Sequence, residues 1–407
     1  MQQAIAMPQF AQRIGRARPS AIMQVAEKAK RLKAEGRDII NFSIGVPNFL
    51  PGDHVYAAAR ESLAHDSGQY GSNRGSDTLL KAFLAHLEKI GLTGYSVANL
   101  ASGIGAKQLI YNLAEALLDE GDTIAFAVPY WTSYRDIAAI VNAKVDLLPC
   151  PAAQDYKLTP QQLQTALEKK PRVFLFNNPS NPTGMVYGRD EIAALADVLV
   201  RYPDTWIITD DIYHAMVFDD LGYYNFAHAR PELRDRLIFV DSLSKTYGMP
   251  GWRVGLMAGP ESVAKAIATL NSNHITSIPE VVQAAAVAAL EGPQDVPASK
   301  RREFQAKRDQ VMDVMDAIPG VVCPRPQGAF YAFPDVSIAF GRVHGPSGLA
   351  IDDDLTFCGA LLETKGVACV PGSAFGEPRA VRISYTCPTP QLVPGLQRFA
   401  EFFAELN

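Results

Sequence analysis

The 407-residue sequence predicts an α/β protein with a large domain, built on a mostly parallel central sheet flanked by helices, and a smaller α+β domain. Between about residues 97 and 260, short β-rich runs alternate regularly with helical patterns. After about residue 295 the chain returns to long helices and short strands with another rhythm. We expect residues 50–295 to form the large domain, and both chain ends, residues 1–49 and 296–407, to form the small one.

Local patterns place the individual elements. A capped helix is predicted from Ser20 to a glycine stop at Gly36. Strands are predicted at residues 97–101, 123–128, 144–148, 172–177, 206–209, 237–240 and 254–258. The alanine-rich run at 281–290 is too short to span a bilayer and predicts a buried helix. A solvated helix face is predicted for a group of basic side chains: Lys300, Arg301, Arg302, Lys307 and Arg308.

Composition and charge exclude several classes of protein. With 48% hydrophobic and 20% charged residues, the chain has the composition of a soluble globular protein. Its net charge of −5 is small and it contains no long Lys/Arg block, so neither nucleic acid nor an anionic membrane is expected as a partner. The expected partner is a small molecule.

Cysteine and histidine patterns bear on location and metal content. The five cysteines include no CxxC pair, which argues against a disulfide framework or zinc site and fits a reducing compartment. The first twenty residues lack the uninterrupted apolar run of a secretory signal, so a cytoplasmic location is expected. The seven histidines show neither HxH nor HExxH spacing, and no metal site is predicted.

The segment SLSKTYGMPGWR, residues 242–253, places a lysine between two serines and ahead of an arginine. An amine captures an aldehyde only when it is partly unprotonated, and burial or a nearby cation such as Arg253 lowers a lysine pKa in that direction. Arg253 also offers a fork of donors to a phosphate, and Ser242 and Ser244 add hydroxyls on either side of Lys245. The segment therefore fits covalently bound pyridoxal phosphate. The alternative is an ordinary surface turn.

A phosphate site is predicted where GIGAKQLIYNLAEALL passes from a strand through glycines into an amphipathic helix. The first turn of such a helix exposes backbone N–H donors at the positive end of the helix dipole. A dinucleotide-binding alternative fits poorly, because Gln108 occupies the third position of GxGxxG and no acidic residue ends a following strand at the expected distance.

Polar residues at two further strand ends are candidates for cofactor contacts. Asp210 and Asp211 follow the predicted strand at 206–209, and a carboxylate there can accept the N–H of a protonated pyridine ring. The two neighbours point differently, so one is expected to be catalytic and the other structural. A metal ligand or a helix cap is the alternative. In NNPSNPTG, Asn181 offers an amide to the cofactor phenolate, although this segment also fits a bare turn.

Two more side chains are candidates for contact with the ring and the substrate. Trp131 lies at a strand end, where its indole would either lie flat on the pyridine ring or anchor the core. In VRISYT, Arg382 lies on the opposite strand face from Val381 and Ile383. A solvent-facing arginine is the commoner arrangement, but its planar fork also suits a substrate carboxylate.

These segments belong to a larger set of motifs: GAKQ at Gly105, PYW at Pro129, NPSNPTG at Asn178, DDIY at Asp210, SLSK at Ser242, GWR at Gly251, GAFY at Gly328, PGSAFG at Pro371 and VRISY at Val381. Through them nearly the whole chain resembles the class I/II aminotransferases of PLP fold type I, most closely the bacterial aspartate aminotransferase-like subgroup. The motifs follow the family's order, with its eight-residue step from lysine to arginine.

The resemblance implies that Lys245, Asp210 and Tyr213 are catalytic and that the cofactor is pyridoxal 5'-phosphate. The implied cofactor contacts are Gly105, Ala106, Lys107, Trp131, Asn181, Asp210, Tyr213, Ser242, Ser244, Lys245 and Arg253, together with Tyr70. The implied substrate contacts are Gly45, Trp131, Asn181 and Arg382. Tyr70 would reach the phosphate of the neighbouring subunit, because the family usually forms homodimers with shared active sites.

The reaction implied by the resemblance is transamination between an L-amino acid and a 2-oxo acid by a ping-pong mechanism, with the freed Lys245 removing and returning the α-proton. A PLP-dependent lyase or synthase, working by β- or γ-elimination or ring closure, is the alternative, because the same cofactor site supports those reactions. A noncatalytic PLP-binding regulatory module is a second alternative, which the intact Lys245, Asp210 and Arg382 disfavour.

Four departures from the family pattern fall where substrate identity is decided. Val46 stands where relatives commonly show an acidic residue, Ile22 where aspartate-using relatives tend to have a threonine, and Arg74 where a small residue is usual. His274 and Ile275 stand where relatives commonly have Asn-Pro in a substrate-facing loop. Arg74 and His274 are candidates to receive a distal anionic group, with ordinary rim residues as the alternative. The amino donor is predicted not to be simply aspartate.

Overall fold

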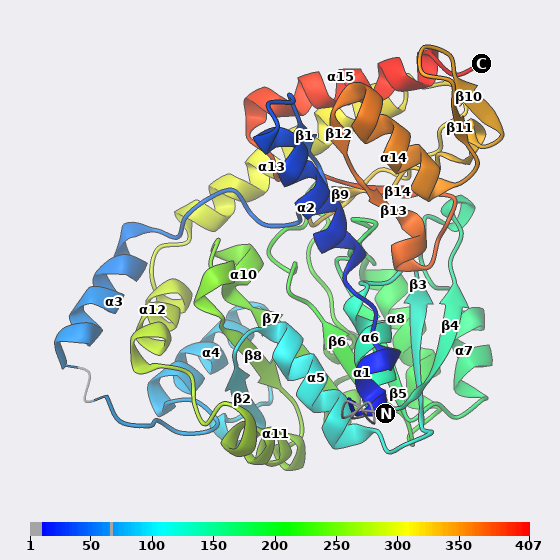
Figure 1. The fold of residues 1–407 in the computed structure, drawn as a ribbon. Coiled ribbons are helices and arrows are strands. Elements are labelled where there is room, and N and C mark those ends of the chain that lie inside the picture. Colours follow the sequence, from blue (N-terminus) through cyan, green and yellow to red (C-terminus); the bar gives the residue numbers. More distant parts are fainter. Residues whose placement is uncertain (1–9, 66–67) are drawn as a thin grey trace, which may run out of the picture.

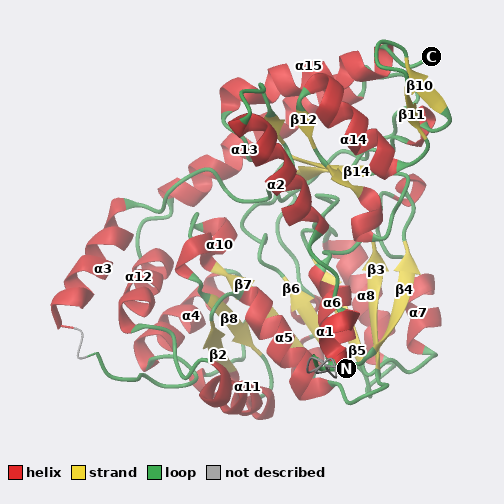
Figure 2. Ribbon diagram, in the orientation of Figure 1, coloured by secondary structure: helices red, strands yellow, loops and turns green. Residues whose placement is uncertain are grey.

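A computed structural model describes residues 10–65 and 68–407, so part of the N-terminal segment expected to lack a secretory signal lies outside the described residues. Figures 1 and 2 show a sheet with helices around it and a smaller unit of helices and short strands packed at one end. The seven strands of the sheet have the order β2-β8-β7-β6-β5-β3-β4. Strand β8 runs antiparallel to both neighbours and the other pairs are parallel. The predicted α/β class is confirmed.

The strands of this sheet lie close to their predicted positions. They are β2 (Leu100–Gly103), β3 (Thr123–Val128), β4 (Lys144–Pro149), β5 (Val173–Asn177), β6 (Trp206–Asp210), β7 (Leu237–Ser242) and β8 (Gly255–Ala258). The largest offset is at β2, because residues 97–99 form a single 3-10 turn, η1 (Val97–Asn99), before the strand begins.

Both faces of the sheet are buried. Phe174 and Phe176 of β5 point into one apolar cluster, and Val173 and Leu175 of the same strand point into another. This alternation is typical of a mostly parallel sheet covered by helices on both sides. The surrounding helices are α3 (Asp53–His65), α4 (Asp77–Lys89), α5 (Ala106–Leu117), α6 (Ser133–Ile140), α7 (Pro160–Leu167), α8 (Arg189–Val200), α9 (Phe226–Ala229), α10 (Leu243–Thr246), α11 (Glu261–His274) and α12 (Glu280–Glu291).

The alanine-rich run predicted as a buried helix is α12, which packs against α3 and α4. Its small side chains Ala285, Ala286 and Ala289 are fully buried and let the neighbouring helices approach closely. Among the described residues, no helix is both long and apolar enough to cross a membrane.

The smaller unit contains strands from both ends of the chain. Strand β1 (Ile40–Asn41) pairs in parallel with β12 (Val367–Ala368). A second sheet has the antiparallel order β13-β14-β9, formed by β13 (Val370–Pro371), β14 (Val381–Ser384) and β9 (Tyr331–Ala332). The helices around these strands are α2 (Ala21–Ala34), α13 (Asp295–Met315), α14 (Asp354–Lys365) and α15 (Thr389–Ala404). A hairpin of β10 (Arg342–His344) and β11 (Leu349–Ile351) completes this part.

The start of α2 follows the predicted capping pattern, because the Ser20 side chain accepts a hydrogen bond from the Met23 backbone. Gly36 follows the helix with a φ of 88°, a conformation that glycine adopts readily. The boundaries predicted at residues 49/50 and 295/296 stay a prediction.

One expectation about α13 is wrong. Lys307 and Arg308 were expected on a solvated face, but they are only 3% and 1% exposed. Arg308 forms a two-pronged ion pair with Asp219, with both N–O distances at 2.7 Å. Lys307 donates to the Cys387 carbonyl at 2.9 Å. Both buried cations have partners distant in sequence, and that compensation is what permits their burial.

Candidate active site

The strand ends bring the predicted site residues together around one cavity. Its volume is about 410 Å³ and its lining includes Gly45, Trp131, Asn181, Asp210, Tyr213, Lys245 and Arg382. Asp210 ends β6, Trp131 follows β3, and Lys245 lies in α10 directly after β7. The carboxyl ends of parallel strands meet at one edge of a sheet, which is where α/β proteins bind ligands.

Lys245 is held at the cavity by a short helix. Its Nζ donates to the Gly45 carbonyl at 2.8 Å, which joins the strand-end segment to the N-terminal part of the chain. Burial, followed by the positive charge of Arg382, lowers the pKa of Lys245 to about 8. Roughly a tenth of the amine is therefore unprotonated at pH 7, and attack on a carbonyl requires this neutral form.

Asp210 has one oxygen occupied and one without a partner. Its Oδ2 accepts a hydrogen bond of 2.5 Å from the Tyr134 hydroxyl. Its Oδ1 is buried and has no hydrogen-bond partner among the described residues. Burial raises the pKa of Asp210 to about 6, against the lowering effect of the Tyr134 hydrogen bond. A buried, unpartnered carboxylate oxygen favours a cationic N–H donor beside it.

Asp211 has different surroundings from Asp210, as expected for adjacent residues. Its Oδ2 accepts a hydrogen bond from the Asn225 amide at 3.0 Å, and Asp211 is absent from the lining of the cavity. The same Asn225 amide lies 2.9 Å from the Thr209 hydroxyl. Asp211 thus belongs to a buried polar network beneath the site.

Arg382 is buried, which rules out the solvent-facing alternative. Its side chain is 1% exposed and lies between the rings of Tyr331 and Phe375, with the guanidinium carbon 4.7 and 5.0 Å from their centroids. It donates to Asn181 Oδ1 at 3.0 Å and to the Ser43 carbonyl at 2.6 Å, while its Nε has no partner among the described residues. A buried guanidinium with no carboxylate partner is suited to a substrate carboxylate.

Tyr213 and Asn181 lie beside this arginine. The Tyr213 hydroxyl is 2.8 Å from that of Tyr331, and Asn181 is the acceptor for Arg382 already described. The Asn181 backbone N–H donates to Asn177 Oδ1 at 2.8 Å, which fixes the loop on the end of β5. These contacts hold two polar side chains at the cavity wall.

The predicted phosphate end is formed where α5 begins. Gly105 has a φ of 95°, and a Cβ there would lie 2.4 Å from a guanidinium nitrogen of Arg253. Arg253 is exposed and donates to the Ile104 carbonyl at 3.0 Å. Ala106 and Lys107 begin the helix, so their N–H groups belong to its unpaired first turn. An exposed guanidinium beside a helix N-terminus fits a phosphate dianion.

The remaining predicted cofactor contacts are the two serines, Trp131 and Tyr70. Ser242 and Ser244 are buried with their hydroxyl oxygens 2.8 Å apart. The Lys107 ammonium lies 4.9 Å from the centre of the Trp131 ring, which connects the helix start to the cavity wall. Tyr70 is not brought to the cavity within one chain; it is 87% exposed and lines a different hollow.

The four departures separate into two groups. Ile22 and Val46 line the cavity. Arg74 instead donates to the Ala98 carbonyl at 3.3 Å, and His274 contacts Asn112, with Nδ1 and Oδ1 3.2 Å apart. Neither Arg74 nor His274 is part of the cavity lining within this chain.

Sequence reasoning assigned no role to Tyr134, Asn177 and Tyr331, which also line the cavity. Tyr331 belongs to the GAFY motif, which contributed to the family resemblance but gave no role for this residue. Asn177 donates to the Asp210 carbonyl at 2.7 Å. Tyr134 lies one helical turn beyond the PYW motif, and nothing in its local sequence points to Asp210.

The fold and this cavity define a class of protein. A solved structure of the aspartate aminotransferase from Rhizobium meliloti matches with a TM-score of 0.95 at 36% identity, covering 98% of this chain and 100% of that one. The aspartate aminotransferase from Thermus thermophilus with maleate matches with a TM-score of 0.88 at 28% identity, covering 97% of this chain and 100% of that one. The fold is therefore PLP fold type I.

Sequence comparison places the chain within a family. The model for "Aminotransferase class I and II" matches residues 37–399. An aspartate/prephenate aminotransferase of Cereibacter sphaeroides is 38% identical over 97% of this chain and 98% of its own length. An aspartate aminotransferase of Rhizobium meliloti is 37% identical over 96% of this chain and 95% of its own length. The chain belongs to the class I and II aminotransferases, and is an enzyme that depends on pyridoxal 5'-phosphate.

The described residues fit this cofactor. The unpartnered Oδ1 of Asp210 suits the pyridine N–H, and the partly neutral amine of Lys245 suits the aldehyde. The exposed guanidinium of Arg253 at the start of α5 suits the phosphate. These three side chains therefore suit the pyridine nitrogen, the aldehyde and the phosphate of the cofactor.

Proposed function

We propose that the enzyme transfers an amino group from an L-amino acid to a 2-oxo acid in two half-reactions. We propose also that the residues lining the cavity bind the cofactor and the substrate and move the α-proton, as set out below. The observation that carries the proposal is that Lys245, Asp210 and Arg382 line one cavity. When bound, pyridoxal 5'-phosphate supplies an aldehyde for the donor amine and a ring that accepts electrons from the α-carbon.

The protein groups then orient the substrate and move one proton. Arg382 binds the α-carboxylate through its planar fork, which fixes the α-carbon within the cavity. The Lys245 amine would take the proton from the substrate α-carbon and return it at the aldehyde carbon of the cofactor. Asp210 keeps the pyridine nitrogen protonated, while Tyr213 and Asn181 hold the ring oxygen. Gly105, Ala106, Lys107, Ser242, Ser244 and Arg253 hold the phosphate end, and Trp131 covers the ring.

A half-reaction tests this function directly. The PLP-loaded protein is mixed with one amino acid and no acceptor, and the absorption spectrum and products are followed. We expect one 2-oxo acid per cofactor, and recovery of the starting spectrum when a 2-oxo acid is added. Ammonia with an unsaturated product would instead support the lyase or synthase alternative. Lys245→Ala should lose proton transfer while retaining cofactor detectable by mass spectrometry.

We propose further that the preferred donor carries an apolar or aromatic side chain. The cavity wall contributed by the N-terminal part of the chain is apolar, consisting of Ile22, Met23, Ala26, Ile44 and Val46. Apart from Lys245 and Arg382, the described lining residues include no Lys, Arg or His. A second carboxylate in this cavity would lose its hydration without gaining a cation from the lining.

Lys107 is the alternative anchor for a distal carboxylate, because its ammonium lies against Trp131. Steady-state kinetics with leucine, methionine, phenylalanine or aspartate as donor distinguish an apolar side-chain pocket from a carboxylate anchor at Lys107. We expect the best apolar donor to exceed aspartate by about tenfold or more in kcat/KM. Aspartate far ahead of all other donors would refute the proposal. If Lys107 were the anchor, Lys107→Gln would slow aspartate while sparing phenylalanine.

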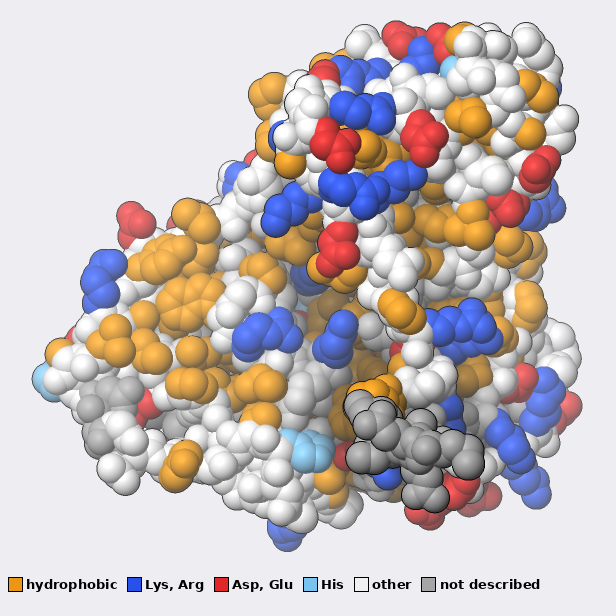
Figure 3. Space-filling view, viewed as in Figure 1, with side chains coloured by type: hydrophobic (Ala, Val, Ile, Leu, Met, Phe, Trp, Pro, Cys, Tyr) orange, Lys and Arg blue, Asp and Glu red, His pale blue; other side chains and the backbone are white. Residues whose placement is uncertain are grey.

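We also propose a homodimer with shared active sites. Figure 3 shows hydrophobic side chains gathered over the region of α3 and α12. Leu50, Leu63 and Tyr70 are 72%, 62% and 87% exposed. Tyr70 lines a hollow of about 550 Å³ together with Ile278, Pro279 and Val287. An apolar surface of this kind favours a second copy of the chain.

Hybrid dimers test the sharing of sites. Light scattering should give twice the chain mass, and mixed dimers of Tyr70→Phe with Lys245→Ala should contain one site carrying neither change. Recovery of activity on mixing, relative to either variant alone, supports the arrangement. A monomeric protein with full activity would refute it.

Finally, we propose a cytoplasmic location, supported by the cysteine pattern. The five cysteines include no CxxC pair, which fits a reducing compartment. Cell fractionation with thiol labelling checks the location, and recovery of the protein outside the cytoplasm would contradict it.

A further inference from the structure

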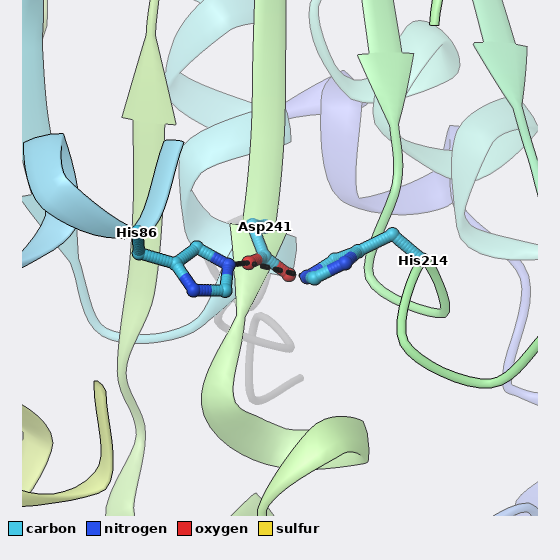
Figure 4. A group of neighbouring side chains, drawn as sticks. All are labelled: His86, His214 and Asp241. Atoms are coloured by element: carbon cyan, nitrogen blue, oxygen red, sulfur yellow. Dashed lines mark hydrogen bonds and ion pairs between the residues drawn. The ribbon is translucent and has the colours of Figure 1, made fainter. Parts of the chain in front are cut away.

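Two histidines and an aspartate converge inside the sheet domain, outside the cavity that contains Lys245. His86 comes from α4, His214 from the segment after β6, and Asp241 from β7. His214 Nε2 lies 3.1 Å from Asp241 Oδ2, and His86 Nε2 lies 3.7 Å from the same oxygen. Figure 4 shows the two rings approaching the carboxylate from opposite sides.

The cluster holds one buried nitrogen whose hydrogen-bonding capacity is not met. All three side chains are more than nine-tenths buried, with exposures of 8%, 5% and 2% for His86, His214 and Asp241. His86 Nε2 is buried, points at the cluster and has no hydrogen-bond partner among the described residues. Such a group carries a desolvation cost unless a ligand satisfies it.

The surroundings favour a cation. Asp241 shares the interior with Asp210 and Asp211, and the negative charge of Asp241 acts on both neighbours. Burial keeps the pKa of Asp211 well above its usual range, which reflects the cost of buried carboxylate charge in this region.

We propose that His86 Nε2, His214 Nε2 and Asp241 Oδ2 bind a divalent transition-metal ion such as Zn²⁺. Two imidazole nitrogens and one carboxylate oxygen form a donor set that zinc and its first-row neighbours accept. Donor atoms bound at about 2.1 Å in tetrahedral or octahedral geometry lie about 3.0 to 3.4 Å apart. The three donors lie within 4.8 Å of one another, so the rings must move closer together when the ion binds.

An ion has a route to this position. His86 and His214 line a surface hollow of about 420 Å³, which also contains Thr246 and Tyr247. The hollow leaves room for water to complete the coordination shell. Lys89 and Arg301 also border it, and both residues are exposed. Among the described residues, no other group of three or more such side chains was close enough to bind a metal.

This position is distinct from the cofactor cavity. None of the three residues lines the cavity that contains Lys245. Asp241 connects the two, because its Oδ1 accepts a hydrogen bond of 2.6 Å from the N–H of Ser242, at the predicted phosphate end. The ion would therefore neutralise buried charge and fix the end of β7, without contacting substrate.

The competing arrangement is a metal-free hydrogen-bonded cluster in which both imidazoles donate to Asp241. Metal binding to the PLP-loaded protein distinguishes the two. After chelator treatment and dialysis, the protein is titrated with Zn²⁺ against a chromophoric competitor, and Co²⁺ is added separately to record its visible absorption. We expect one ion per chain and a visible absorption of bound Co²⁺ typical of imidazole ligands. We also expect a rise in melting temperature on addition of Zn²⁺.

Matched histidine variants localise the ion. His86→Gln removes one ligand and should weaken zinc binding by about 100-fold or more, beyond the 10- to 100-fold cost of losing a supporting contact. His54→Gln removes a histidine of α3 and should leave the affinity unchanged. Both variants should retain bound cofactor, which confirms that they fold. Binding of less than one-tenth of an ion per chain, or equal affinity in wild type and His86→Gln, would overturn the proposal.

Discussion

The Tyr134 hydroxyl donates a 2.5 Å hydrogen bond to Asp210 Oδ2, across 76 residues of sequence. This bond leaves Oδ1 as the oxygen without a protein partner. It also opposes the rise in the Asp210 pKa that burial causes. The tyrosine therefore orients the carboxylate and favours its ionised form.

Tyr134→Phe should shift the acidic limb of the activity profile to higher pH. Loss of the donor raises the pKa of Asp210, so the carboxylate becomes protonated, and its role is lost, at a higher pH than in the wild type. A shift of about one unit corresponds to about 1.4 kcal/mol. Profiles of kcat/KM against pH measure it. Tyr130→Phe removes a hydroxyl from the same loop and should leave the limb in place; an unmoved limb in Tyr134→Phe would contradict the assigned role.

Arg382→Lys should raise KM for both amino and oxo acids with a smaller effect on kcat. The lysine keeps the charge but loses the planar fork and the stacking between Tyr331 and Phe375. We expect KM to rise about 10- to 100-fold, which corresponds to the loss of one charge-assisted hydrogen bond. Arg379→Lys, an exposed arginine paired with Asp335, is the matched control. A normal KM in Arg382→Lys would place the carboxylate elsewhere.

Capture of the cofactor by the apoprotein should accelerate with rising pH, with a midpoint near 8. The neutral amine of Lys245 is the reactive form, and its pKa is lowered to about 8 by burial first and by Arg382 second. Below that pH the ammonium predominates and capture slows. Stopped-flow absorbance after mixing with pyridoxal phosphate records the rate. Arg382→Gln should move the midpoint upward, whereas a wild-type midpoint close to the ordinary lysine value of 10.5 would contradict the lowered pKa.

Gly45→Ala should destabilise the protein and impair the site. A Cβ at this position would lie 2.2 Å from the Tyr331 hydroxyl oxygen, so that ring or the Gly45 backbone must move. Overpacking of this kind costs about 1 to 3 kcal/mol. Thermal unfolding and kcat measure the two effects. Gly359→Ala, where nothing lies within 4 Å, is the control and should not lower the melting temperature.

Much of the fold could be predicted from local sequence. The strands were readable because each is a short apolar run bounded by turn residues, as at β3 (Thr123–Val128). Lys245 and Arg253 were readable because they share one short segment with distinctive chemistry. In each case the information needed lies within a few neighbouring residues.

Other features depend on contacts that local sequence does not encode. Arg308 was expected in solvent, because its partner Asp219 lies 89 residues away. Tyr134 gave no sign of its bond to Asp210. The spacing of the seven histidines predicted no metal site, yet the proposed cluster takes its ligands from three separate elements. Spacing rules find sites built on one helix or loop and miss those assembled by the fold.

The parallel pairing of β1 with β12 has a consequence for biosynthesis. Ile40 pairs with Val367, so the first strand of the chain has no partner until nearly all of the protein has left the ribosome. The sheet domain between them can form earlier, because domains fold as units during synthesis. Gly45, which accepts the Lys245 hydrogen bond, follows β1 by a few residues. Lys245 should therefore gain its contact with Gly45 only when translation is almost complete.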